Sequence, residues 1–185
     1  MSTRLRWGIL SSSKFARTKV IPALLNAPSV ELAAIASRDA ATARTHADSF
    51  GIPTAYGSYE ELLADPTIDV IYNPLPNHLH VEWSIRAARA GKHVLCEKPL
   101  GVSTAEVDAL IAARDEAKVL IGEAFMVATH PQWLWVKSAI EDGKIGQLRA
   151  IQGFFSYTNT DPANIRNKAD AHGGAIMDIR SEEHT

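Results

Sequence analysis

The chain has 185 residues, of which 46% are hydrophobic, and its formal net charge is −2 at pH 7. This length allows about one complete domain plus a smaller remainder, and the hydrophobic content excludes an intrinsically disordered chain. The balanced charge argues against nucleic acid as a partner, and the single cysteine, Cys96, excludes an internal disulfide and a thiolate metal cage. We therefore expect a cytoplasmic protein with no metal site and no membrane span.

Short apolar runs in the first two thirds of the chain have the length and composition of buried strands. They cover Leu5–Leu10, Val30–Ala36, Val70–Tyr72, Val94–Cys96 and Val119–Ile121. Stretches with helical spacing lie between them, at Lys14–Leu25, Ala40–Phe50, Tyr59–Leu63, Leu79–Ala90 and Thr104–Ala117. This alternation predicts an α/β fold, with a doubly wound parallel sheet of the Rossmann type covered by helices on both faces.

Two of these helices are predicted to begin with a capping box. Ser58 pairs with Glu61, and Ser103 with Glu106, so that a hydroxyl and a carboxylate reciprocally satisfy free backbone N–H groups.

The pattern changes after Gly122. A helix is predicted at Gln132–Glu141, and an alternating run at Leu148–Tyr157 predicts a strand. One helix and one strand cannot close a domain. We therefore expect a Rossmann domain over residues 1–123 and an incomplete second domain over residues 124–179.

The first predicted strand leads into a serine-rich loop where a dinucleotide-binding fold carries a glycine-rich phosphate loop. The loop reads Ser11-Ser12-Ser13-Lys14-Phe15-Ala16. Glycines there let the backbone approach a pyrophosphate at the helix N-terminus, whereas a serine Cβ narrows that approach. The alternative is that the serines only cap the helix.

The second predicted strand ends at Ser37-Arg38, where such folds face the adenosine ribose. An acid at this point binds a free 2′-hydroxyl, whereas arginine accommodates a 2′-phosphate. The site therefore indicates NADP rather than NAD. The alternative is a solvated arginine beside Asp39, which caps the next helix.

Two more candidate segments follow strands at the same sheet edge. Asn73–His80 is a proline-stiffened turn opening a helix, and its histidines are either functional or ordinary surface and capping groups. Glu97-Lys98-Pro99 carries a lysine that could stabilise an alkoxide beside a nicotinamide, or it is an exposed Glu and Lys pair. Cys96 is expected to be a buried small hydrophobe rather than a nucleophile.

Together these segments resemble the glucose-fructose oxidoreductase, inositol dehydrogenase and rhizopine-catabolism (Gfo/Idh/MocA) family, over residues 4 to 179. The residues that carry the resemblance are Trp7-Gly8-Ile9-Leu10, Ala36-Ser37-Arg38, Asn73-Pro74-Leu75-Pro76-Asn77 with His80, Glu97-Lys98-Pro99 and Gly173-Gly174-Ala175-Ile176-Met177-Asp178-Ile179. Asn164-Ile165-Arg166 and the later glycine-rich segment are similar to the branch with NADP-dependent xylose dehydrogenases and dihydrodiol dehydrogenases.

The resemblance implies roles for individual residues. Lys98 matches the catalytic lysine, and Asp178 an acid near the substrate. Cofactor contacts are implied for Ser11, Ser12, Ser13, Lys14, Phe15, Ser37, Arg38, Pro74, Leu75, Asn77, His80, Glu97 and Lys98. The Lys98-Pro99 bond is often cis in relatives. NADP is the implied cofactor, with NAD as the alternative, and a sugar, polyol or diol is the implied substrate.

Several positions depart from the family pattern. Ser11 replaces the first glycine of the phosphate loop, His172 replaces the first of three glycines, and Val127-Ala128 stand where relatives often carry Tyr-Arg. Relatives have glycine at position 180 and a catalytic Tyr or His at position 182, where this chain has Arg180 and Glu182. Residues 180–185 resemble a translated sequencing adapter, and the alternative is a natural acidic tail.

Family members are nearly twice as long, and the resemblance implies that residues 124–179 begin an α+β open-sheet substrate domain. The free face of that sheet commonly makes a homo-oligomer. We expect an NAD(P)-dependent dehydrogenase acting on CH–OH groups in the parent protein, and an inactive fragment here. The alternatives are a non-catalytic dinucleotide-binding module and a nonfunctional gene fragment.

Overall fold

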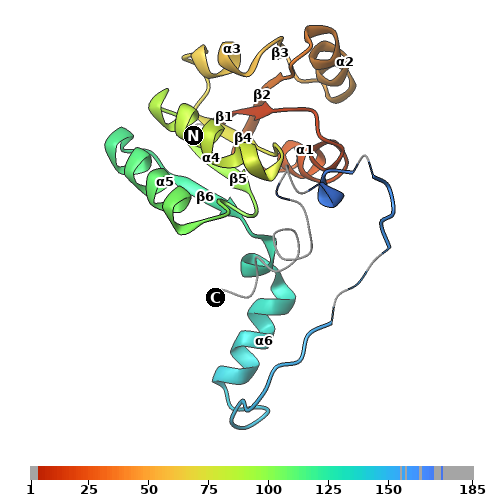
Figure 1. The fold of residues 1–185 in the computed structure, drawn as a ribbon, viewed down its shortest axis with the longest axis vertical. Helices are drawn as coiled ribbons and strands as arrows, with labels where there is room; N and C mark the ends of the chain where they lie inside the picture. The colour runs from red at the N-terminus through yellow and green to blue at the C-terminus, as the bar shows by residue number, and fades with distance from the viewer. Residues whose placement is uncertain (1–3, 155, 157, 163, 169–171, 173–185) are drawn as a thin grey trace.

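The computed structural model describes residues 4–154, 156, 158–162, 164–168 and 172. Its strands form one sheet in the order β3-β2-β1-β4-β5-β6, and every neighbouring pair is parallel (Figure 1). The strands are β1 (Leu5–Leu10), β2 (Val30–Ala36), β3 (Thr54–Tyr56), β4 (Val70–Asn73), β5 (His93–Glu97) and β6 (Ile121–Ala124). Because all the strands are parallel, their carboxyl ends lie at one edge of the sheet. From β1 the chain first adds strands on one side and then, from β4, on the other, so the direction of strand order reverses between β1 and β4. The predicted doubly wound fold is confirmed.

Helices cover both faces of this sheet. They are η1 (Ala16–Val20), α1 (Ile21–Leu25), α2 (Ala40–Phe50), α3 (Tyr59–Ala64), α4 (Asn77–Arg89) and α5 (Thr104–Ala117). Three further helices follow β6, namely η2 (Met126–Thr129), α6 (Pro131–Glu141) and η3 (Ile165–Asn167), and α6 projects away from the sheet. On one face, Ile21 of α1 and Ala47 of α2 pack with Ile9 and Ile35 of the sheet. On the other face, Leu62 of α3 and Trp83 of α4 pack with Ile71. The two clusters form the core that the alternating pattern predicts.

Two local predictions differ from the structure. The strand predicted at Val119–Ile121 lies later in the chain, at Ile121–Ala124, because Leu120 is 73% exposed and its N–H bonds the His93 ring instead of a neighbouring strand. The strand at Thr54–Tyr56 was not predicted. It has three residues, which are too few to show an alternating pattern, and it forms at the sheet edge by pairing with β2.

The strand predicted at Leu148–Tyr157 is wrong over the residues that the structure describes there, 148–154 and 156. Ile151 and Phe154 are 81% and 92% exposed. A strand exists only where a second strand satisfies its backbone groups, and the structure shows no partner for these described residues. In Figure 1 the coloured trace after α6 turns at the lower end of that helix and runs back up towards α1 as an extended chain, without joining the sheet.

The predicted capping boxes are confirmed. The hydroxyl of Ser58 accepts from the N–H of Glu61 at 3.1 Å, and the hydroxyl of Ser103 from the N–H of Glu106 at 3.3 Å. The two glutamate carboxylates accept from the residue that precedes the capping serine rather than from the serine itself. Glu61 accepts from the N–H of Gly57, and Glu106 accepts from the N–H of Val102. These bonds set where α3 and α5 begin.

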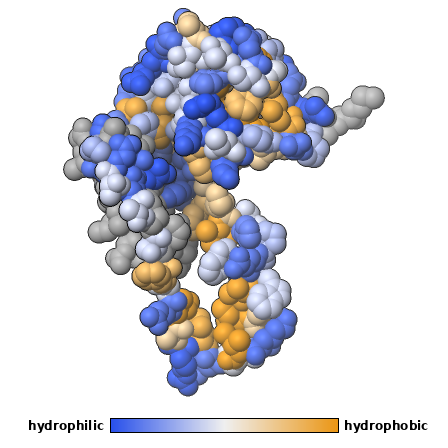
Figure 2. Space-filling model, turned by 90° about the vertical axis from the view of Figure 1, so that its right-hand side faces the viewer, coloured by the Kyte–Doolittle hydropathy of each residue, from blue (hydrophilic) through white to orange (hydrophobic). Residues whose placement is uncertain are grey.

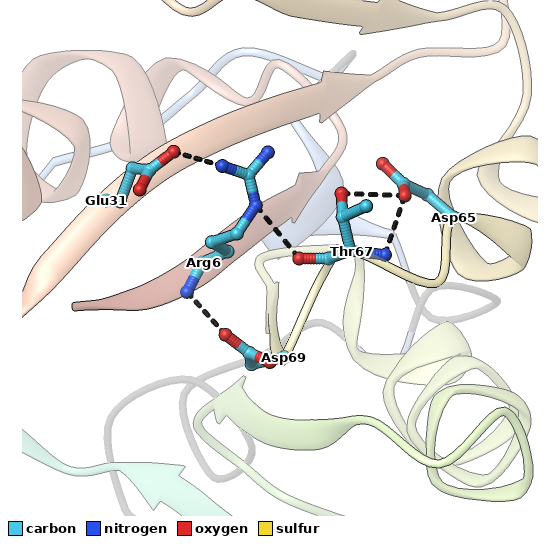
Figure 3. Close-up of polar contacts among 5 residues, drawn as sticks. All are labelled: Arg6, Glu31, Asp65, Thr67 and Asp69. Atoms are coloured by element: carbon cyan, nitrogen blue, oxygen red, sulfur yellow. Dashed lines mark hydrogen bonds and ion pairs between the residues drawn. The ribbon is translucent and has the colours of Figure 1, made fainter. Parts of the chain in front are cut away.

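Polar side chains connect β1, β2 and the loop before β4 at the amino-terminal edge of the sheet (Figure 3). Arg6 of β1 pairs with Glu31 of β2, and its Nε donates to the carbonyl of Thr67 at 2.9 Å. Its backbone N–H donates to the Asp69 carboxylate at 2.8 Å, while the Asp65 carboxylate accepts from the backbone and hydroxyl of Thr67. These polar groups of the amino-terminal edge are engaged with one another. The candidate ligand-binding segments follow the strands at the opposite, carboxyl edge.

Candidate functional site

The serine-rich loop follows β1 at the carboxyl edge. Ser11 has a φ of 77°, a left-handed conformation that favours glycine, and its N–H donates to the Ala36 carbonyl at 2.9 Å. The Ser13 hydroxyl accepts from the Ala16 N–H at 3.2 Å, which makes it the helix cap. Lys14 and Phe15 are exposed at the start of the helix. The loop thus keeps the backbone turn of a glycine loop although it lacks the glycine.

Replacing Ser11 with glycine is expected to raise the free energy of unfolding by about 0.5–1 kcal/mol. The left-handed conformation costs a serine more than a glycine, and the greater freedom of glycine in the unfolded chain offsets part of that gain. Urea denaturation followed by circular dichroism measures the difference. Ser12→Gly is the matched control and should lower stability, because Ser12 is not among the described residues with positive φ. Equal effects of both changes would contradict strain at Ser11.

Ser37 and Arg38 directly follow β2 at this edge. The Ser37 N–H donates to the Tyr56 carbonyl at 3.1 Å, and Arg38 is exposed. Asp39 caps α2, since its carboxylate accepts from the N–H of Thr42 at 2.7 Å, and the Thr42 hydroxyl and N–H lower the pKa of Asp39. Arg38 therefore stands exposed beside a carboxylate that is already engaged as a helix cap.

The turn between β4 and α4 is organised by a buried asparagine. The side-chain amide of Asn73 donates to the carbonyl of His80 at 3.1 Å and to the hydroxyl of Ser84 at 3.0 Å, and its oxygen accepts from the Leu75 N–H. Pro74 and Leu75 are buried, and Asn77 is half-buried. The side chain of Asn77 donates to the carbonyl of His172 at 3.0 Å, which places His172 beside this turn.

The His80 ring lies between the β4–α4 turn and the turn after β5, and the residue is only 1% exposed. Its Nδ1 is 2.7 Å from the Pro99 carbonyl oxygen, and its Nε2 is 2.6 Å from the Leu75 carbonyl oxygen. Burial lowers the pKa of His80, while the two carbonyls act in the opposite direction. The ring therefore offers no free nitrogen to a ligand and instead joins the β4–α4 turn to the turn after β5.

The Glu97-Lys98-Pro99 turn ends β5, and its Lys98–Pro99 bond is cis, as the resemblance implied. Three side chains from other elements hold this turn. The Tyr72 hydroxyl donates to Glu97 at 2.6 Å, His80 contacts the Pro99 carbonyl, and the Glu123 carboxylate accepts from the Leu100 N–H at 2.8 Å. Lys98 itself is half-buried. Its backbone is thus held from β4, α4 and β6.

Cys96 is fully buried, and burial raises the pKa of its thiol to about 12. This confirms the prediction of a small buried hydrophobe and excludes a ready thiolate nucleophile. Across the described part of the chain, no group of three His, Cys, Asp or Glu side chains could hold a metal ion. No helix in the described ranges has the length and apolarity of a membrane span.

The structure brings the four predicted segments to the carboxyl edge of the sheet, on both sides of the point where the strand order reverses. Asp178 lies outside the described residues. Sequence reasoning missed Tyr72 and Glu123 as parts of the site. Tyr72 was assigned only to a buried strand, and Glu123 fell outside the strand predicted at Val119–Ile121. The available signal was a tyrosine hydroxyl placed near the end of a strand.

Residues 5–125 match the family described as "Oxidoreductase family, NAD-binding Rossmann fold". The chain is 51% identical over 175 residues to an uncharacterized oxidoreductase of Rhizobium meliloti. This match covers 95% of this chain and 52% of the relative. It is 45% identical over 177 residues to D-xylose 1-dehydrogenase (NADP(+)) 2 of Haloferax volcanii, covering 95% of this chain and 54% of the relative.

Among solved structures, a 3-ketoreductase from Actinomadura kijaniata in complex with NADP and TDP-benzene matches with a TM-score of 0.90 and 38% identity. The match covers 96% of this chain and 54% of that one. The chain therefore spans about half the length of the relatives that it matches.

Proposed function

Because the chain belongs to the Gfo/Idh/MocA oxidoreductase family with its NAD-binding Rossmann fold, we propose a dehydrogenase or reductase function for the whole protein. It transfers a hydride between NADP(H) and a CH–OH group of a sugar, polyol or diol. The observation that carries this proposal is the Lys98 turn at the carboxyl edge of the sheet, where the strand order reverses.

The residues at this edge fit a dinucleotide. The positive φ of Ser11 turns the backbone towards the helix start, where the N–H groups of the first turn lack acceptors within the helix. Ser12, Ser13, Lys14 and Phe15 would hold the pyrophosphate, and Ser37 and Arg38 the adenosine ribose with its 2′-phosphate. Pro74, Leu75 and Asn77 would line the nicotinamide end. When bound, the cofactor accepts or supplies the hydride.

Lys98 supplies a positive charge beside the reacting carbon in this proposal. As a C–H bond breaks, negative charge develops on the substrate oxygen, and an ammonium fixed in advance stabilises it without reorganising. Asp178 would be an acid near the substrate. Two of the three relatives reported above support the cofactor, since the name of one includes NADP(+) and the other was solved with NADP.

We further propose that residues 1–123 bind the dinucleotide and that residues 124–179 belong to a substrate and oligomerisation domain. Large hydrophobic side chains on and near α6 are exposed. Figure 2 shows hydrophobic, orange surface on the lower lobe of the molecule. The exposed side chains include Met126, Trp133, Leu134, Trp135 and Ile145. In the whole protein this surface would be covered, consistent with a larger domain.

Fluorescence titration and turnover assays together test the function. Residues 1–185 are expected to bind NADPH without turning over any substrate, and the whole protein should oxidise a member of a sugar, polyol and diol panel with NADP. Failure of the whole protein to bind either NADPH or NADH would refute the proposal. Binding without turnover on the full panel would favour the dinucleotide-binding module.

Replacing Arg38 with aspartate is expected to weaken NADPH binding and to shift preference towards NADH. The change removes the cation that would pair with the 2′-phosphate and supplies a carboxylate that can accept from a free 2′-hydroxyl. We expect the NADPH to NADH affinity ratio to fall at least about tenfold, which corresponds to about 1.4 kcal/mol. Isothermal titration with both cofactors measures it.

Arg89→Asp makes the same charge change at the end of α4, on the opposite edge of the sheet, and serves as the control. It should leave the affinity ratio unaltered. An Arg38 variant that behaves like this control would mean that Arg38 is only a solvated surface residue.

A further inference from the structure

Tyr72 is a large side chain that is fully buried next to the Lys98 turn. In the β4–β5 register Tyr72 lies opposite Leu95, and Glu97 follows two residues later on the same face of the sheet. This places the Tyr72 hydroxyl 2.6 Å from Oε1 of Glu97, to which it donates a hydrogen bond. The sheet register, rather than a flexible contact, therefore sets this pair.

The Glu97 carboxylate links Tyr72 to Lys98. It accepts from the Tyr72 hydroxyl and from the backbone N–H of Lys98. Burial raises the pKa of Glu97, and Glu123 of β6 acts in the same direction. The Tyr72 hydrogen bond and the Lys98 charge oppose that rise. The neighbouring Cys96 is a neutral thiol, since burial raises its pKa to about 12.

We propose that Tyr72 is a positioning residue for Lys98: its hydroxyl fixes the Glu97 carboxylate, which in turn holds the backbone and the charge of Lys98 at the carboxyl edge of the sheet. Tyr72 touches no substrate in this assignment and acts only through Glu97. The inference rests on the proposed function, because the held lysine is the one that stabilises the alkoxide. A protonated Glu97 would no longer provide the counter-charge.

A second tyrosine provides a matched control. Tyr56 donates its hydroxyl to the Asp65 carboxylate at 2.9 Å, on the loop that leads to the amino-terminal edge of the sheet. Tyr56→Phe therefore deletes the same kind of hydrogen bond at a place remote from Lys98. Tyr72→Phe keeps the buried ring and deletes only the hydroxyl, so both variants should fold.

Carbon-13 NMR of the Glu97 carboxyl group tests the link without requiring turnover. Deleting the Tyr72 hydroxyl removes a bond that favours the ionised carboxylate, so the Glu97 pKa should rise further, by about one unit. The titration midpoint in Tyr56→Phe should match the unmodified protein. Glu97→Gln assigns the resonance. An unmoved midpoint in Tyr72→Phe would overturn the inference.

The pH profile of kcat in the whole protein tests the consequence for catalysis. As pH falls, Glu97 becomes protonated, and a higher Glu97 pKa moves this loss to higher pH. The acid limb of Tyr72→Phe should therefore shift upwards by about one pH unit, equivalent to about tenfold in kcat at a pH below the limb. The KM for NADP should change less than about twofold, because Tyr72 makes no contact with the cofactor in this assignment.

Glu97→Gln keeps an acceptor for Tyr72 but removes the charge, so it should lower kcat and abolish the acid limb. If Tyr72→Phe and Tyr56→Phe gave the same pH profile, the Tyr72 bond would be merely structural and the inference would fail. Lys98→Ala separates the two proposals: normal turnover there would defeat the proposed role of Lys98 itself. Lost turnover there, with an unshifted Tyr72→Phe profile, would defeat only the inference about Tyr72.

Discussion

Replacing Lys98 with alanine is expected to lower kcat in the whole protein by about 100- to 1,000-fold, the usual effect of removing one group that stabilises developing charge. The Lys98 backbone is held by the Tyr72–Glu97 pair, by His80 through Pro99 and by Glu123 through Leu100. None of these three hydrogen bonds uses an atom of the Lys98 side chain. The substitution should therefore remove the ammonium while leaving the turn in place.

The measurement is steady-state kinetics with NADP and the best substrate from the panel, together with NADPH affinity. Affinity should change much less than kcat, since the lost interaction forms mainly in the transition state. Lys98→Met fills the space without the charge and should be impaired to a similar extent. Lys118→Ala, in the exposed residue that ends α5 at the opposite edge, is the control. Normal turnover in Lys98→Ala would refute the assigned role.

Replacing Gly8 with alanine is expected to lower the free energy of unfolding by about 1–3 kcal/mol, the usual cost of overpacking a core. A Cβ at Gly8 would lie 2.8 Å from Cδ1 of Leu62 and 3.3 Å from Cγ2 of Ile68. Leu62 is completely buried, so it cannot move aside without displacing its neighbours. Gly8 thus lets α3 approach β1 closely. Urea denaturation measures the loss.

Gly122 offers the control, because it lies in β6 of the same sheet and an added Cβ there meets nothing within 4 Å. Gly122→Ala should leave stability unchanged or raise it by about 0.5 kcal/mol. Shortening the opposing side chain with Leu62→Val should cost less in the Gly8→Ala background than alone. Simple additivity would show that Leu62 is not the group that Gly8→Ala strains.

Positions where glycine was expected illustrate the reach of sequence reasoning about the site. Ser11 and His172 stand where the family carries glycine, and both adopt positive φ in the structure, 77° and 52°. The structure thus shows, at both positions, the left-handed conformation that favours glycine, although neither residue is glycine. The cost of that conformation and the hydrogen bond from Ser11 to Ala36 required the structure.

His80 shows the opposite case. The resemblance implied a cofactor contact for His80. The structure instead shows its ring between the carbonyls of Leu75 and Pro99. These residues lie on separate turns, so their meeting depends on how α4 packs against the sheet. Likewise Glu123, which bonds the N–H of Leu100, lies within β6, whereas the strand predicted from periodicity ends at Ile121.

The amino-acid sequence by itself determined the alternation of strands and helices, the capped starts of α3 and α5, and the segments that follow the strands. Each of these depends on hydrophobic spacing or on side chains a few residues apart, which are local in the chain. The tertiary structure alone decided the strand order, the short edge strand β3, and the absence of the predicted strand in described residues 148–154 and 156. It also decided the contact of Tyr72 with Glu97. All of these depend on partners distant in the chain, because backbone groups of a strand and a buried hydroxyl are satisfied only by what packs beside them.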